Sequence, residues 1–184
     1  MNNNKARLYT KYPLQSILIY NGSTIIHYIL GGVAIIIGYR ILPEIANILG
    51  ILYLLFSFIE MYIVMPLTVC PHCVYYKLKN SLCISGLNVI SKRFAKSGGA
   101  NKLGNRAKGV FCFNNMYIFA LIIPILVTIP ALIINYSVLL LILFISLVVL
   151  LMFRFFILFV KIACLHCRAK FTCPQAGQMG VRER

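Results

Sequence analysis

Four long apolar stretches limit the folds that this chain can adopt. They cover roughly residues 24–42, 44–69, 110–135 and 138–162. An apolar run of about 18 or more residues with few charges has the length and composition of a membrane-spanning helix. Over all 184 residues, 61% are hydrophobic and 11% are charged, whereas a soluble domain has about 45–50% and 25%. The sequence therefore predicts an all-α integral membrane protein with four transmembrane helices.

Short turns join these stretches in pairs. Pro43 separates the first two, and residues 135–137 separate the last two, so the chain is expected to form two helical hairpins. Five regions follow: a basic N-terminal, interfacial segment (1–23), the first hairpin (24–76), a basic loop (77–109), the second hairpin (110–167) and a basic tail that contains a cysteine (168–184).

The basic residues predict the orientation of the chain. Lys and Arg number 18 and Asp and Glu number 3, which gives a net charge of +15. Apart from Arg40 and Arg154, every basic residue lies in the N-terminal segment, in the acid-free loop, or at Lys161 and beyond. The positive-inside bias then places both termini and the loop in the cytoplasm, with the helices in the cell (cytoplasmic) membrane.

The basic loop also predicts what the cytoplasmic face binds. Basic residues near a membrane attract anionic lipid headgroups with about 1 kcal/mol each. Other protein subunits of a membrane complex are the next expectation, since an acidic partner would fit this face. No nucleic-acid partner is expected, because no known binding module accompanies the charge.

Two short motifs predict an internal duplication. Cys70-Pro-His-Cys73 and Cys164-Leu-His-Cys167 each close a long apolar stretch, and they are 94 positions apart (70 to 164). Each half contains two spans, so tandem-duplicated hairpins would have the same orientation, related by an axis along the membrane normal. Both motifs would then lie at the same depth on the cytoplasmic side.

Paired cysteines at this spacing are typical of metal sites. Two Cys-x-x-Cys turns from separate elements can supply four thiolates to a tetrahedral zinc or to iron in a sulfur site. Cys70-Pro-His-Cys73 is similar to the knuckles of zinc ribbons and rubredoxins. A reducing cytoplasm keeps such thiols available as ligands. The expected ligands of one zinc or iron–sulfur centre are Cys70, Cys73, Cys164 and Cys167.

Four further residues lie within or close to these motifs in the sequence. Cys83 and Cys173 are additional candidate ligands, and Pro174 after Cys173 is typical of iron–sulfur ligation. His72 and His166, one inside each motif, are expected to surround the centre as hydrogen-bond donors to sulfur rather than as ligands.

Two charged residues fall inside apolar stretches. Glu60 and Arg154 each precede the first cysteine of their motif by ten positions (60 to 70, 154 to 164). Ten helical residues span about 15 Å, which reaches the middle of a hydrocarbon core about 30 Å thick. Because charge is costly at this depth, we expect the two to form an intramembrane ion pair; a proton-accepting role for Glu60 is the alternative. His27 is expected to be a hydrogen-bonded packing residue.

These observations leave three functions open. The first is a metal-binding subunit of a larger membrane assembly, in which the centre clamps the hairpins and helps to dock a partner. The second is an electron-transfer subunit between a membrane quinone and a soluble partner. The third is a membrane thiol–disulfide oxidoreductase, because Cys-Pro-His-Cys resembles the redox pair of oxidising thioredoxin-fold enzymes. The cytoplasmic cysteines and the missing βαβ context disfavour the third, and no hydrolase constellation is present.

Overall fold

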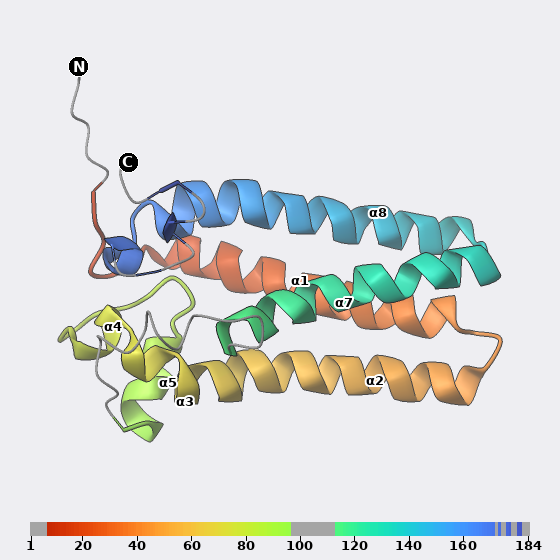
Figure 1. The fold of residues 1–184 in the computed structure, drawn as a ribbon, viewed down its shortest axis with the longest axis horizontal. Helices are drawn as coiled ribbons and strands as arrows, with labels where there is room; N and C mark the ends of the chain where they lie inside the picture. Colours follow the sequence, from red (N-terminus) through yellow and green to blue (C-terminus); the bar gives the residue numbers. More distant parts are fainter. Residues whose placement is uncertain (1–6, 97–112, 172, 174–175, 178–179, 182–184) are drawn as a thin grey trace, which may run out of the picture.

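The computed structural model describes residues 7–96, 113–171, 173, 176–177 and 180–181. Within these residues the chain is helical, and four helices long and apolar enough to cross a membrane run side by side (Figure 1). These spans are Leu14–Gly38, Pro43–His72, Met116–Ile134 and Val138–Cys164. The predicted all-α fold with four transmembrane helices is confirmed.

Each span consists of one or more helical elements. The first is α1 (Leu14–Gly38). The second contains α2 (Pro43–Ile59), the π-helical turn η1 (Glu60–Val64), α3 (Met65–Thr68) and the 3-10 turn η2 (Cys70–His72). The third is α7 (Phe113–Ile134), and the fourth contains α8 (Val138–Phe153) and the π-helix η4 (Arg154–Cys164). The short helices are α4 (Val74–Lys77), α5 (Leu87–Phe94) and η5 (Arg168–Phe171).

The first helix begins earlier than the apolar stretch that predicted it. Pro13 precedes its first turn, and the helix starts at Leu14. Polar side chains in the first turns kept this region out of the apolar stretch, but they form hydrogen bonds within the helix. Asn21 Nδ2 donates to Ile17 O (3.0 Å) and Ser23 Oγ donates to Tyr20 O (3.0 Å). Residues 14–23 therefore belong to the membrane-spanning helix.

The helices α1 and α7 form the centre of the bundle. In Figure 1, α8 and α2 lie on opposite sides of this central pair, and α1 contacts α2, α7 and α8. Close approach of α1 to α7 depends on glycine, because a Cβ atom at Gly38 would lie 2.7 Å from Ala131 Cβ. Small residues allow such close approach between membrane helices.

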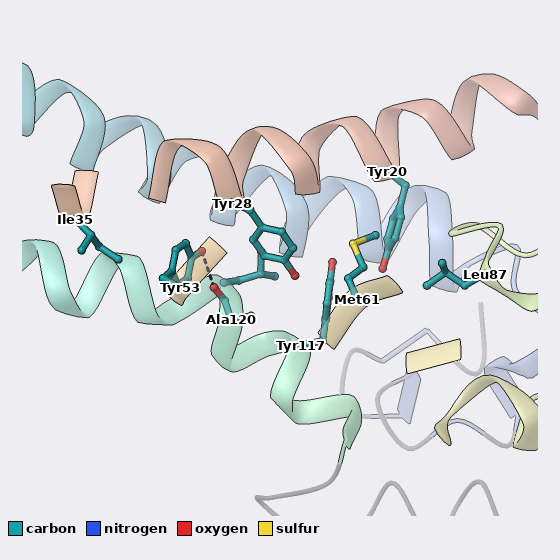
Figure 2. Close-up of a cluster of buried hydrophobic side chains, with 9 residues drawn as sticks. Tyr20, Tyr28, Ile35, Tyr53, Met61, Leu87, Tyr117 and Ala120 are labelled. Carbon is teal, nitrogen blue, oxygen red and sulfur yellow. Dashed lines mark hydrogen bonds between the residues drawn. The ribbon is translucent and has the colours of Figure 1, made fainter. Parts of the chain in front are cut away.

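Large apolar side chains cover the outside of the bundle. Ile48 and Leu52 of α2 and Ile142 and Val149 of α8 are each more than half exposed. Such a surface suits a hydrocarbon environment, whereas soluble proteins rarely expose apolar patches of this extent. The interior instead contains tyrosines, which form a cluster between α1, α2 and α7 (Figure 2).

Candidate metal centre

The two cysteine motifs lie at the same end of the bundle. Cys70 begins η2 directly after α3, and Cys164 is the last residue of η4. Figure 1 shows the start of α1, the short helices α4 and α5 and the end of the fourth span together at this end. The six cysteines that the structure describes are partly buried and form no disulfide with one another: Cys70, Cys73, Cys83, Cys164, Cys167 and Cys173.

Both motifs contain the same backbone hydrogen bond between their two cysteines. The Cys73 N–H donates to Cys70 O (3.1 Å), and the Cys167 N–H donates to Cys164 O (3.2 Å). A short helical turn follows each motif, α4 in the first half and η5 in the second. Each turn therefore places its two cysteines at the junction between a membrane-spanning helix and a short surface helix.

The N-terminal segment, residues 7–12, lies between the two motifs. The Tyr9 N–H donates to His166 O (2.9 Å) on the side of the second motif. On the other side, the Tyr12 N–H donates to Leu82 O (3.0 Å), and the Leu82 N–H donates to Thr10 O (3.1 Å). The segment therefore joins the region after the first motif to the second motif.

Tyrosine side chains strengthen this connection. Tyr75 OH donates to Tyr9 O (2.7 Å) and accepts from the Arg168 N–H (3.3 Å). Tyr12 OH donates to Ala163 O. The sequence predicted only a basic, interfacial region for this segment, and not this connecting role. Tyr9 and Tyr12, two closely spaced aromatic residues in an otherwise polar and basic segment, were the sequence feature that could have indicated it.

The thiols share a buried aromatic environment. Cys73, Cys83 and Cys167 all pack against the buried cluster that contains Tyr12 and Tyr75. Burial raises the pKa of the Cys167 thiol to about 12, and the nearby Cys83 thiol adds to the rise. Buried neutral thiols are poor nucleophiles, and each would have to lose its proton to bind a metal.

Electrostatic interactions connect cysteines of both motifs. Burial raises the pKa of Cys73 to about 12, partly offset by the Tyr75 backbone N–H, and the nearby Cys167, Cys83 and Cys173 thiols raise it further. The structure thus brings cysteines from residues 70–83 and 164–173 into one region. However, no group of three or more His, Cys, Asp or Glu among the described residues has a metal-binding arrangement.

The motif histidines lie in different surroundings. His72 is buried, with 8% of its surface exposed. His166 Nδ1 lies 2.8 Å from Arg7 O, and its ring stacks on Tyr9 with 4.7 Å between ring centroids. His166 therefore helps to hold the N-terminal segment.

The predicted ion pair between Glu60 and Arg154 is not formed. Both side chains are buried, but Arg154 Nη1 donates to Ser23 Oγ (3.3 Å), and Glu60 Oε1 has no hydrogen-bond partner. The arrangement of the helices explains this result. Glu60 and Arg154 continue α2 and α8, which lie on opposite sides of α1 and α7 (Figure 1).

Aromatic rings surround the Arg154 guanidinium instead. The guanidinium carbon, Cζ, lies 4.6 Å from the Tyr20 ring centroid, 5.1 Å from that of Tyr117 and 5.5 Å from that of Phe159. A cation over a ring gains about 0.5–2 kcal/mol. The sequence predicted that Arg154 is buried in the membrane, but it predicted Glu60 as its neighbour instead of these aromatic rings.

His27 has the packing role expected from the sequence. It is 1% exposed, and its Nε2 lies 2.9 Å from Leu121 O of α7. This contact ties the two central helices together.

Comparisons with known protein families, with curated proteins and with solved structures found no match.

Proposed function

We propose that this chain is a metal-binding subunit of a membrane protein assembly, with a cysteine-ligated zinc or iron–sulfur centre at the cytoplasmic end of the bundle. One observation carries the proposal. Six cysteines, from two segments far apart in the sequence, gather at the same end of the bundle on both sides of the N-terminal segment. A metal bound by both motifs would clamp the two hairpins together.

The preferred ligands are Cys70, Cys73, Cys164 and Cys167. A Cys-x-x-Cys turn can present both sulfurs to one ion, and four thiolates complete a closed tetrahedral site. Metal binding replaces the thiol protons, and its free energy adds to that of folding.

Cys83 and Cys173 lie beside these four. Electrostatic interaction connects Cys83 with Cys70 and with Cys73, and connects Cys173 with Cys164. Each half therefore contributes three thiols to the region. This number suits a four-thiolate centre with two neighbouring thiols, or two metals that share thiolates.

A tandem duplication would explain the paired geometry, and matching features at a spacing of 94 support it. The π-helical elements begin at Glu60 and Arg154. Beyond the motifs, Gly86 and Gly180 both have left-handed backbones, with φ of 73° and 63°. We therefore propose that the halves are related by an axis between α1 and α7.

The basic end is proposed to face the cytoplasm and to contact anionic lipid. Helix α5 supports this orientation, because Val89 and Phe94 are more than half exposed beside Lys92 and Arg93. A short helix with exposed apolar and basic side chains suits the membrane interface. A partner subunit with an acidic surface would dock on the same face.

Electron transfer is the second candidate, and a row of rings favours it. Tyr20 and Phe159 have ring centroids 6.2 Å apart, and Phe159 and Phe155 have centroids 5.6 Å apart. These rings run from the buried Tyr20 to Phe155, which lines an open apolar pocket with Met152 and Phe156, where a membrane quinone could exchange electrons with an iron–sulfur centre. Thiol–disulfide exchange has less support, because the motif cysteines are partly buried.

Elemental analysis and a visible spectrum of the anaerobically purified protein test the proposal. We expect a stoichiometric metal that is lost in Cys73→Ser and Cys167→Ser. The matched control is Cys112→Ser, which removes a cysteine distant from the motifs in the sequence and should retain the metal. Zinc without visible absorbance selects the structural clamp, and iron with sulfur-to-iron absorbance selects electron transfer. Metal-free protein whose motif cysteines all react with an alkylating agent would refute both.

A further inference from the structure

Arg154 carries a positive charge that no described carboxylate neutralises. Its side chain is 2% exposed, and neither Nε nor Nη2 has a hydrogen-bond partner. The whole chain contains only three acidic residues. Of these, Glu44 lies in the first turn of α2. Glu60 continues α2 on the opposite side of the central pair of helices, where it interacts electrostatically with Tyr28 but does not pair with Arg154. The rings around Arg154 lessen the burial penalty, but they leave two donor groups unsatisfied.

Two tyrosines beside Arg154 also have unused hydroxyl groups. Tyr28 is fully buried and Tyr117 is 4% exposed, and neither hydroxyl has a partner. The Tyr28 phenol interacts electrostatically with the guanidinium, and the Tyr117 ring packs against it. Figure 2 shows both hydroxyls directed into the interior of the bundle between α1 and α7.

These groups share one chemical property, which is that each can donate a hydrogen bond. A guanidinium donates only and stays protonated. A water molecule could accept from these donors but would leave the positive charge unbalanced at membrane depth. An anion would satisfy the donors and the charge together. We propose that Arg154, Tyr28 and Tyr117 bind a small inorganic anion, such as chloride, inside the membrane-spanning bundle.

The site is separate from the cysteine centre. Tyr20, whose ring packs on Arg154, belongs to the buried cluster against which Cys70 packs. None of the three anion-binding residues is a proposed metal ligand. Anion binding therefore does not rest on the metal proposal and should persist in Cys73→Ser.

Equilibrium dialysis of the full-length protein in detergent, with radiolabelled chloride, tests the site. We expect one saturable chloride per chain. Arg154→Gln should abolish binding, and Tyr28→Phe and Tyr117→Phe should weaken it about tenfold, because each removes one donor and keeps the ring. The matched control is Tyr53→Phe: this tyrosine belongs to the same cluster, but its hydroxyl already donates to Ala120 O (2.9 Å). That variant should bind chloride normally.

A stability measurement provides a second readout. Replacing gluconate by chloride at constant ionic strength should raise the thermal midpoint of the wild type by about 3 °C, if millimolar chloride occupies the site. The increase should disappear in Tyr28→Phe and Tyr117→Phe and remain in Tyr53→Phe. If Arg154→Gln does not fold, the two tyrosine variants decide the question. Wild-type protein without saturable chloride binding, or normal binding by both tyrosine variants, would overturn the proposal.

Discussion

His27 Nε2 lies 2.9 Å from the carbonyl oxygen of Leu121, and the two residues are 94 positions apart. The Cys-x-His-Cys motifs have the same spacing (70 to 164). In a protein with two equivalent halves, equivalent positions meet only at the axis between the halves. This contact therefore lies at the axis that the proposed duplication requires.

Replacing His27 by Leu should destabilise the bundle. The substitution removes the buried hydrogen bond between the His27 ring and Leu121 O. A loss of about 1–3 kcal/mol in the free energy of unfolding is expected. Denaturant titration in detergent measures it. His27→Gln, which retains a polar group, should recover part of the loss, and equal stability of Leu, Gln and wild type would contradict this role.

Replacing Gly38 by Ala should separate α1 from α7. The added Cβ would lie 2.7 Å from Ala131 Cβ, so one of the two backbones must shift. Overpacking of this kind costs about 1–3 kcal/mol. Gly22→Ala is the matched control, because a Cβ at Gly22 has no neighbour within 4 Å. Thermal unfolding should show a lower midpoint for the first variant and an unchanged or higher midpoint for the second, and the opposite order would refute the close packing.

Replacing Tyr75 by Phe should release the N-terminal segment. The variant loses the hydrogen bonds to Tyr9 O and from the Arg168 N–H, each worth about 1 kcal/mol. Hydrogen exchange at residues 9–12 should become several-fold faster. Tyr76→Phe is the control, because its hydroxyl bonds to Ala95 O instead. Unchanged exchange in Tyr75→Phe, or an equal increase in both variants, would show that Tyr75 does not hold the segment.

Removal of the proposed metal should expose the cysteines to reagent. A membrane-permeant chelator is expected to lower the thermal midpoint and to increase alkylation of Cys73 and Cys167, because the metal shields the sulfurs and its binding adds to stability. Mass spectrometry of alkylated peptides measures the change at each cysteine. The Cys73→Ser variant should show no further response to chelator. Equal alkylation with and without chelator in the wild type would contradict a bound metal.

Hydrophobicity predicted the elements of this fold well but said little about their neighbours. The apolar stretches identified all four spans, because every residue in a stretch contributes to the same signal. The start of α1 was missed because Asn21 and Ser23 are polar in the sequence but form hydrogen bonds within the helix. Glu60 and Arg154 were placed at similar depth, yet depth does not reveal that α2 and α8 lie apart.

The candidate site was predictable to a similar extent. Repetition of Cys-x-His-Cys predicted that both motifs reach the same end of the bundle, where the structure has them. The intervening N-terminal segment was not predictable from this pattern. Its contacts depend on backbone pairing of Tyr9 with Cys167 and of Lys11 with Leu82, and isolated pairing of this kind leaves no periodic signal.

The position of the N-terminal segment makes one part of the fold depend on sequence that is translated much later. Tyr9 and Arg7 make contacts with His166. During synthesis the segment is therefore available before the second hairpin that carries this histidine. Until then the segment has only its contacts with the first half, through Tyr75 and Leu82. A product that stalls before the second hairpin would lack the connection between the two cysteine motifs.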